Sequence, residues 1–185
     1  VVENLDLELD EGEILELRGN SGKGKTTIKR CIAGLEEYNE GKIDINGDIS
    51  YVFQDERVLP WLNVMKNILT PLKLRNEEIT EEKIAEIRDI AERFGIEEHL
   101  NKDINEISGG ELQRLLVLRG IITDPDILLL DEPFNSVDEE TRTGIYEELL
   151  EICREKSLSV IVSSHNNDVG KFADRVVDLH KEQAS

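Results

Sequence analysis

Hydrophobic and polar positions along the first third of the chain predict strands with one helix between them. Apolar and acidic residues alternate over residues 5–9, which is typical of a half-buried strand, and residues 14–18 form a second short apolar run. Residues 26–34 follow helical spacing and end at Gly34, a residue type that commonly stops a helix. Residues 43–53 predict one or two strands around a turn at Asn46-Gly47-Asp48.

The middle of the chain carries a helical pattern and almost no strand signal. From residue 65 to about residue 101 apolar residues recur at helical spacing, and another helix is predicted over residues 108–123. We therefore expect residues 56–123 to form a helical subdomain. It would be inserted into an α/β core made of residues 1–55 and 124–185.

Strand and helix patterns alternate again in the last third. Strands are predicted at residues 126–131, 158–163 and 175–179, and helices at residues 139–156 and 167–173. Such alternation is typical of a mainly parallel sheet covered by helices on both faces. The fold class predicted is therefore α/β, in a single domain of residues 1–185.

Composition limits the class of partner. The 185 residues include 41 acidic and 22 basic side chains, a net charge of −19. Binding to duplex nucleic acid or to an anionic membrane surface needs basic side chains, so both are disfavoured. No apolar run approaches the ~20 residues of a membrane span, and we expect no signal peptide from residues 1–4. Cys31 and Cys153 fit either reduced cytosolic thiols or simply small core residues.

One segment fits the phosphate-binding pattern G-x-x-x-x-G-K-[ST] at every fixed position. It consists of Gly19, Asn20, Ser21, Gly22, Lys23, Gly24, Lys25 and Thr26, and Thr27 follows it. The glycines let backbone N–H groups turn toward a phosphate, and the next helix points its positive end there. We expect Lys25 to reach the β- and γ-phosphates and the Thr26 hydroxyl to bind Mg²⁺. The alternative is a solvated Gly/Lys turn, in which case the segment would match the phosphate-binding pattern by a rare chance. Lys23 fits either a phosphate contact or a solvated side chain.

A second motif ends a buried strand with two carboxylates. Four aliphatic residues, 127–130, precede Asp131 and Glu132. Open α/β sheets bind ligands at the carboxyl edge to which such a strand delivers its last side chains. We expect Asp131 to hold Mg²⁺ directly or through water, and Glu132 to polarise an attacking water. The alternative is a strand that merely ends in an acidic turn, and the upstream phosphate motif favours the catalytic interpretation.

A helix start combines a capping box with two glycines. Ser108 and Glu111 have the spacing of a capping box, which by itself is a purely structural feature. Gly109 and Gly110, however, cost roughly 1 kcal/mol each in helix propensity. A close approach of phosphate to bare backbone N–H groups would explain that cost.

Together, and in this order, these segments resemble the ATP-binding subunit of ABC transporters. The motif from Gly19 resembles the family's Walker A motif and the one ending at Glu132 its Walker B motif. The segment from Ser108 resembles the signature sequence, in which Glu111 stands where the family usually has Gln. The resemblance implies a P-loop NTPase (RecA-like) core with a mainly parallel sheet, N-terminal antiparallel strands and an inserted helical subdomain.

Three further residues gain a role only through this resemblance. Gln54 resembles the Q-loop glutamine that touches Mg²⁺ and contacts the transmembrane partner, Asp138 belongs to a segment like the D-loop, and His165 resembles the switch histidine that contacts the γ-phosphate. The implied catalytic residues are then Glu132, His165 and Gln54, and the implied metal ligands are Thr26, Gln54 and Asp131. The implied nucleotide contacts are the residues of the phosphate motif with Thr27, together with Ser108, Gly109, Gly110, Glu111 and Asp138.

The resemblance also implies the partners. Two copies would bind two ATP molecules head to tail, each Ser108 capping the nucleotide held by the other copy, and closure would drive a transmembrane permease. The chain would lie in the cytoplasm, peripheral to the inner or plasma membrane through that permease, without direct lipid insertion and without nucleic acid. Leu59-Pro60-Trp61 after Gln54 further resembles the nitrate, sulfonate and taurine importers, which implies a small anionic solute. Trp61 is expected either near the groove for the partner's coupling helix or packed inside the helical subdomain.

The chain departs from the family before the Walker A motif. Members usually carry an aromatic residue there that stacks on adenine, and residues 1–18 contain none. By analogy with base stacking, we expect nucleotide affinity to be weaker by about 1–3 kcal/mol. The departure fits either a fragment of a longer chain or a reduced natural form.

The function predicted is therefore an Mg-dependent ATPase that powers an ABC importer. The alternative is a soluble ABC-type switch or assembly ATPase without a transport partner, for which a reduced adenine site would be adequate. A DNA-directed ABC ATPase is disfavoured by the negative charge and by the lack of a long coiled-coil pattern.

Overall fold

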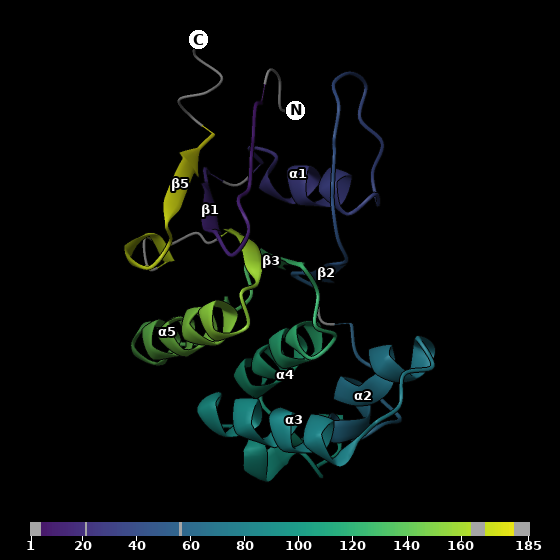
Figure 1. Cartoon of the computed structure of the whole chain (residues 1–185). Coiled ribbons are helices and arrows are strands. Elements are labelled where there is room, and N and C mark those ends of the chain that lie inside the picture. Colours follow the sequence, from purple (N-terminus) through teal and green to yellow (C-terminus); the bar gives the residue numbers. More distant parts are fainter. Residues whose placement is uncertain (1–4, 21, 56, 164–168, 180–185) are drawn as a thin grey trace.

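A five-stranded parallel sheet forms the centre of the molecule (Figure 1). The computed structural model describes residues 5–20, 22–55, 57–163 and 169–179. The strands are β1 (Ile14–Arg18), β2 (Ile49–Val52), β3 (Ile127–Asp131), β4 (Ser159–Ser163) and β5 (Arg175–Asp178), in the order β2-β3-β4-β1-β5. All neighbouring pairs run parallel, so β1 and β3 end at the same edge with β4 between them.

Continuous apolar runs explain why the central strands are buried on both faces. Leu128, Leu129 and Leu130 of β3 are all 0% exposed, and Leu129 pairs in register with Ile161 of β4. A parallel sheet covered on both faces needs such unbroken runs, because residues pointing either way meet a packed helix. The strands predicted from the sequence over the central and C-terminal runs are confirmed to within about two residues.

Helices cover both faces of this sheet (Figure 1). Helix α1 (Lys25–Ile32) packs on one face, where Ile28 joins a cluster with Leu15 and Leu129. Helices α4 (Gly109–Ile121) and α5 (Glu139–Glu155) cover the other face, over the side chains of β1, β3 and β4 that point away from α1. The sheet therefore separates two hydrophobic clusters.

The chain between β2 and β3 is helical. It forms α2 (Val64–Leu74), α3 (Glu81–Arg93), two short 3₁₀ turns, η1 (Glu97–His99) and η2 (Ile104–Glu106), and then α4. Helix α4 packs against α2 and α3 on one side and against β2 and β3 on the other. Because α4 belongs to both packing units, the exact division at residues 56 and 123 stays a prediction.

Trp61 lies on the surface of this helical region. Its exposed fraction is 75%, so the expectation that it packs inside the helical subdomain is wrong. Leu74, at the end of α2, is 79% exposed. The region therefore presents two large apolar side chains to its surroundings.

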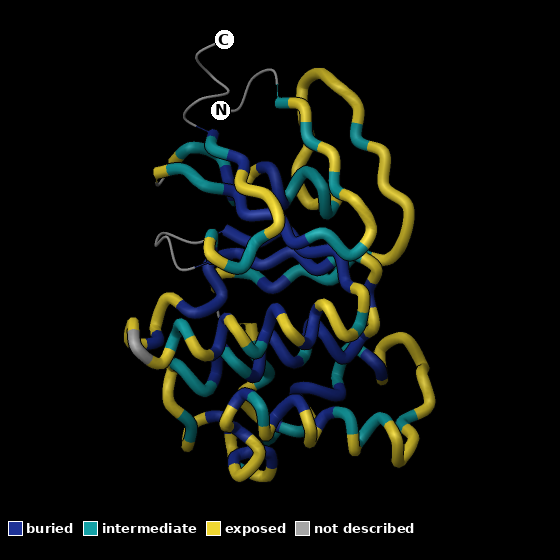
Figure 2. The backbone as a smooth tube through the Cα atoms, turned by 60° about the vertical axis from the view of Figure 1, so that its left-hand side comes forward, coloured by how far each residue is buried: buried dark blue, intermediate teal, exposed yellow. Residues whose placement is uncertain are grey.

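The antiparallel N-terminal strands predicted from the sequence are not formed in the described residues. Residues 5–9 are extended without a strand ladder, and residues 34–48 form a long, mostly exposed loop (Figure 2). The alternation still has a packing consequence, because Leu5, Leu7 and Leu9 lie against the α1-side cluster. The pattern indicated correctly which side is buried, but backbone pairing depends on a partner strand that the loop does not supply.

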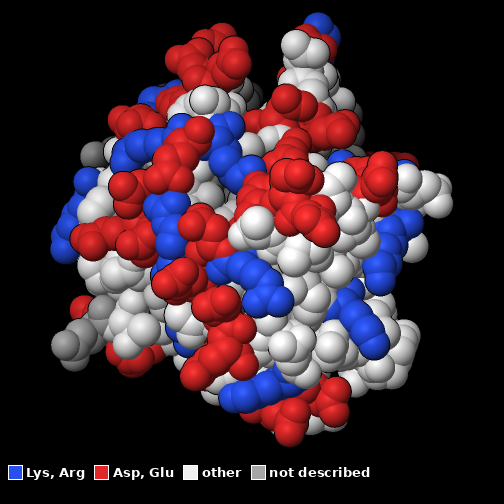
Figure 3. All heavy atoms as spheres, turned by 60° about the horizontal axis from the view of Figure 1, so that its bottom comes forward, with Lys and Arg blue, Asp and Glu red and all other residues white. Residues whose placement is uncertain are grey.

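Acidic and basic side chains intermingle on the surface. Figure 3 shows this on the face that looks down in Figure 1, with acidic groups more numerous. Arg93 of α3, for example, contacts Glu148 at 2.9 Å and Glu155 at 2.7 Å on α5. Exposed pairs of this kind contribute little stability. No helix in the described ranges is long and apolar enough to span a membrane.

Gly120 allows α4 to approach the sheet closely, so a larger residue there should destabilise the fold. A Cβ at this position would lie 2.8 Å from Val52 Cγ2 and 3.3 Å from Leu128 Cδ1. We expect Gly120→Ala to lower the free energy of unfolding by about 1–3 kcal/mol in urea denaturation. Gly144→Ala is the matched control, since Gly144 is an exposed α5 glycine with no atom near its would-be Cβ. That exchange should raise stability by about 0.5–1 kcal/mol, and equal effects at both positions would contradict the argument.

Candidate active site

The phosphate motif forms the turn between β1 and α1. Gly24 caps the helix with a φ of 93°, a left-handed conformation that glycine adopts without a steric penalty. Helix α1 begins at Lys25, so its first N–H groups face the turn. Backbone N–H groups at a helix start form an anion-binding position. Ser21 of this motif lies outside the described residues.

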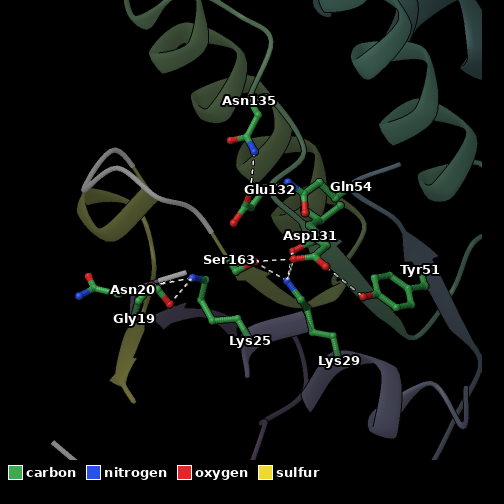
Figure 4. Close-up of polar contacts among 11 residues, drawn as sticks. Gly19, Asn20, Lys25, Lys29, Tyr51, Gln54, Asp131, Glu132, Asn135 and Ser163 are labelled. Carbon is green, nitrogen blue, oxygen red and sulfur yellow. Dashed lines mark hydrogen bonds and ion pairs between the residues drawn. The ribbon is translucent and has the colours of Figure 1, made fainter. Parts of the chain in front are cut away.

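Lys25 lies across this turn. Its Nζ donates to the carbonyl oxygen of Gly19 at 2.6 Å and to that of Asn20 at 3.4 Å (Figure 4). The side chain is only 5% exposed. Thr26 and Lys23 are half-buried, while Thr27 and Gly22 are exposed. The ammonium is therefore held beside the turn by the chain's own carbonyls.

Asp131 occupies the carboxyl end of β3 and is 2% exposed. Its Oδ1 accepts hydrogen bonds from Lys29 Nζ at 2.6 Å and from Ser163 Oγ at 3.0 Å. Its Oδ2 accepts from the Tyr51 hydroxyl at 3.2 Å (Figure 4). Burial raises the pKa of Tyr51, and the Asp131 charge adds to this, so the phenol stays protonated and can donate. Three donors from α1, β2 and β4 thus converge on one carboxylate.

Lys29 is the partner of Asp131 that the sequence reasoning missed. It is 0% exposed, and its Nζ also donates to the Leu130 carbonyl at 3.0 Å and to Ser163 Oγ. Burial lowers the pKa of Lys29 to about 8, while the nearby carboxylate opposes that fall. The pKa of Asp131 is lowered because the Lys29 charge and hydrogen bond outweigh the effect of burial. The pair is therefore ionised at neutral pH.

A weak sequence signal for Lys29 existed. It follows Lys25 by one helical turn and neighbours Ile28, which packs on the sheet, so a cation stood on an apolar helix face. A buried lysine needs an anionic partner. The pattern could not name Asp131 as that partner, about a hundred residues away.

Glu132 is held in an unusual backbone conformation. Its φ is 51°, in the left-handed region that residues other than glycine seldom adopt, and its N–H donates to the Ser163 carbonyl at 3.1 Å. Its Oε2 accepts from Gln54 Nε2 at 3.0 Å and from Asn135 Nδ2 at 2.5 Å (Figure 4). Strained residues held by their surroundings cluster at functional sites. Two amide donors therefore orient this carboxylate, and Asn135 is a second contributor without a role in the sequence-based prediction.

The signature segment and the D-loop segment form helix caps that touch each other. Ser108 Oγ accepts from the Glu111 N–H, and Glu111 Oε2 accepts from the Ser108 N–H at 2.7 Å, which confirms the capping box. The Ser108 hydrogen bond lowers the pKa of Glu111. Asp138 caps α5 by accepting from the Thr141 N–H at 2.9 Å. Each of these residues therefore has a structural role, whatever it contacts besides.

An amide bridge joins the two caps. Gln113 Nε2 donates to Ser136 Oγ at 3.0 Å, and Gln113 Oε1 accepts from the Ser136 N–H at 3.0 Å. A Cβ on Gly110 would lie 3.4 Å from Val137 Cγ2, so the start of α4 packs directly on this turn. Residues 108–113 and 135–138 therefore pack against each other and are joined by hydrogen bonds.

The predicted residues fall into two groups. Lys25, Gln54, Asp131 and Glu132 gather with Lys29, Tyr51, Asn135 and Ser163 at the carboxyl edge of the sheet (Figure 4). The other described residues of the phosphate motif belong with this group, in the turn before α1 and at the start of that helix. The second group, Ser108, Gly109, Gly110, Glu111 and Asp138, is arranged around the starts of α4 and α5. His165 lies outside the described residues.

The first group offers oxygen ligands suited to Mg²⁺. The carboxylate of Asp131 and the hydroxyl of Thr26 lie near each other, because Thr26 contributes to the lowered pKa of Asp131, and Gln54 adds an amide oxygen. Among the residues that the structure describes, no cluster of three or more His, Cys, Asp or Glu side chains could hold a metal by itself. Mg²⁺ commonly uses one or two protein ligands and completes its shell with phosphates and water. These donors therefore fit Mg²⁺ bound together with a nucleotide.

Asp131→Asn should leave the ammonium of Lys29 buried without a counter-charge. We expect the free energy of unfolding at pH 7 to fall by about 3–5 kcal/mol. The loss should be smaller at pH 9, because Lys29, whose pKa is already lowered to about 8, can then lose its proton in the folded state. Urea denaturation at both pH values measures this. Asp44→Asn, which removes an exposed ion-pair partner, should change stability little; similar losses at both positions would overturn the interpretation.

Comparison with known proteins identifies the family of the chain. A family model described as "ABC transporter" matches residues 2–135, more than half of the chain. Over 176 residues the chain is 36% identical to the aliphatic sulfonates import ATP-binding protein SsuB of Bacillus subtilis (strain 168), covering 91% of this chain and 68% of that protein. The SsuB protein of Bacillus anthracis is 36% identical over 186 residues, covering 96% of this chain and 72% of that protein.

Solved structures show the same fold. A dimeric bacterial ABC transporter cassette matches with a TM-score of 0.84 and 27% identity, covering 96% of this chain and 85% of that chain. A dimeric, post-hydrolysis ATP-binding cassette bound to ADP and Pi matches with a TM-score of 0.82 and 28% identity, with the same coverage. The α/β fold with a P-loop core, predicted from the motifs, is confirmed. The chain therefore belongs to the ABC transporter family, as one of its ATP-binding domains.

Proposed function

We propose that this chain binds and hydrolyses ATP with Mg²⁺ and thereby powers an ABC importer of a small anionic solute. The observation that carries the proposal is the convergence of Lys25, Gln54, Asp131 and Glu132 at one edge of the sheet. The relatives named as sulfonate import proteins support an importer and do not favour the soluble switch.

Nucleotide phosphates would bind at the turn before α1. The Lys25 ammonium, now held by the Gly19 and Asn20 carbonyls, would reorient by a small side-chain rotation to meet the β- and γ-phosphates. The backbone N–H groups at the start of α1 supply further donors, and the helix dipole favours the anion. Lys23, Thr26 and Thr27 complete the phosphate-facing set.

The metal would be held by Thr26, Gln54 and Asp131. When bound, Mg²⁺ supplies charge neutralisation on the transferring phosphoryl group. Hard oxygen donors suit this ion, and Thr26 is near enough to Asp131 to help lower the pKa of its carboxylate. The protein's part is to keep these donors on rigid elements, namely the first turn of α1 and the end of β3.

Glu132 would act as the general base. Water attacks the γ-phosphorus, the bond to the β-phosphate oxygen breaks, and the carboxylate accepts the proton of the water. The amides of Gln54 and Asn135 fix the orientation of the carboxylate before the nucleotide arrives. His165, through the family resemblance, would contact the γ-phosphate.

Two copies of the chain would close on the nucleotides. The solved cassettes of similar fold are dimeric, which supports dimerisation. We propose the head-to-tail arrangement in which Ser108, Gly109, Gly110 and Glu111 of one copy cap the nucleotide of the other. The bridge between Gln113 and Ser136 would make the signature segment and Asp138 respond together.

A permease would be the membrane partner. Trp61 lies seven positions after Gln54 in the sequence and is 75% exposed, so it is available for an apolar contact with a partner. Isolated exposed aromatic residues of this size are enriched at protein interfaces. The chain would then be cytoplasmic and held at the membrane through that permease alone.

Glu132→Gln should abolish hydrolysis and preserve nucleotide binding. Glutamine cannot accept the proton, so we expect the Mg·ATP hydrolysis rate to fall by about 10²–10⁴-fold. Phosphate release measures the rate, and Glu147→Gln, an exposed exchange on α5, is the matched control that should keep the wild-type rate. Equal rates for Glu132→Gln and wild type would exclude Glu132 as the base.

The same variant also provides a second readout. With ATP intact, Glu132→Gln should accumulate as a dimer in sedimentation, and it should be monomeric without nucleotide. Monomers under both conditions would refute the head-to-tail dimer without affecting the assignment of the base.

Trp61→Ala should weaken attachment to the permease without weakening ATP binding. Loss of a buried interface aromatic typically costs more than 1 kcal/mol, so retention on membranes of the source cells should fall by about tenfold. Leu35→Ala is the control, because Leu35 is a 58% exposed apolar residue in the loop between α1 and β2, outside the helical region that contains Trp61. Equal retention of both variants and wild type would count against a permease contact at Trp61.

A further inference from the structure

Lys29 is a buried cation at the proposed metal site, although none of the proposed chemical steps requires it. We propose that Lys29 is a positioning residue that acts as a resident counter-cation for Asp131 and so makes nucleotide binding at this site less dependent on Mg²⁺. This inference rests on the proposed function, because it concerns how strongly the proposed metal and nucleotide help each other to bind.

Hydrogen bonds hold the Lys29 ammonium beside Asp131. An ammonium has three N–H donors, and the Lys29 donors have three partners: Asp131 Oδ1 at 2.6 Å, the Leu130 carbonyl at 3.0 Å and Ser163 Oγ. The partners come from β3 and β4 and the lysine from α1, and the side chain is 0% exposed. Turning toward the nucleotide would break all three hydrogen bonds in a place that water cannot reach.

The same contacts change what Asp131 offers to a metal. One oxygen already accepts from Lys29 and Ser163, and the other accepts from Tyr51. A full positive charge 2.6 Å from the carboxylate cancels most of its field at the neighbouring metal position. A divalent ion arriving there would meet a nearly neutral pair instead of an anion.

The lysine also changes how the site receives the phosphates of the nucleotide. Lys29 lies one helical turn after Lys25 on α1, and its charge is within electrostatic range of Lys25 and Glu132. In a poorly solvated site its field reaches the phosphates with little screening. Lys29 therefore cancels the repulsion that the Asp131 carboxylate would exert on the phosphates when Mg²⁺ is absent, and it weakens the hold on Mg²⁺ when the metal is present. Both effects reduce the advantage that the metal gives to nucleotide binding.

The test is the metal dependence of nucleotide affinity, not the rate of hydrolysis. We would titrate the full chain with mant-ADP, which is not hydrolysed, once in excess EDTA and once in saturating Mg²⁺. The ratio of the two dissociation constants measures how far the metal and the nucleotide assist each other. We expect a small ratio for wild type and a ratio about tenfold larger for Lys29→Met, which corresponds to roughly 1.4 kcal/mol of coupling.

Two further variants separate charge from structure. Lys29→Gln removes the charge and keeps an amide donor for Asp131, so it should show the larger ratio even if Lys29→Met does not fold. Lys73→Met, at an exposed lysine on α2, should keep the wild-type ratio. Adding Asp131→Asn to Lys29→Met should lower the ratio again, because the carboxylate through which Lys29 acts is gone. A ratio that stays high in this double variant would overturn the proposal.

A purely structural role for Lys29 predicts a different result. Lys29→Met and Lys29→Gln would then lose stability but keep the wild-type ratio of dissociation constants. A wild-type ratio in both variants would overturn this inference and leave the proposed function intact. Failure of the wild-type chain to bind mant-ADP in either buffer overturns the proposed function and this inference with it. Larger ratios in Lys29→Met and Lys29→Gln, with Lys73→Met unchanged, support it.

Discussion

The buried ion pair between Lys29 and Asp131 is the constraint on which the rest of the site depends. It fastens α1 to the ends of β3 and β4, and so fixes the turn before α1 relative to the carboxylates that follow β3. Removing one partner of such a pair lowers stability by far more than the intact pair contributes, because the remaining charge is left buried away from water. The position of the phosphate turn is therefore tied to the ionisation of one aspartate.

Ser163 extends this constraint to the neighbouring residue. Its hydroxyl bonds to the ion pair, and its carbonyl accepts the N–H of Glu132, whose φ of 51° would otherwise be unfavourable. The end of β4 thus positions both Asp131, the last residue of β3, and Glu132, which follows it, although β4 contributes no charge of its own. This follows from the strand order, in which β4 lies between β1 and β3.

The phosphate turn is locally positive, although the protein as a whole carries a large negative charge. A chain of net charge −19 repels polyanions at long range, yet α1 places Lys25 and Lys29 one helical turn apart, next to the N–H groups of its own start. Short-range donors in a poorly hydrated place outweigh a diffuse field that salt screens. The many exposed acidic groups, several paired with Arg93 across α3 and α5, leave that local balance intact.

The sequence by itself determined most of the helices, the strands of the parallel sheet and the identity of the motifs, because these depend on local spacing. Residues 14–18 form a short apolar run and pack as β1, and the glycines before Lys25 form a turn wherever they are placed in a fold. Only the tertiary structure decided that Lys29 is buried against Asp131, that Gln54 and Asn135 converge on Glu132, and that residues 5–9 lack a strand partner. Periodicity shows which side of an element is buried, but the partner on that side comes from distant parts of the chain. Strand order and helix packing bring those parts together, and neither can be predicted from the spacing of residues within one segment.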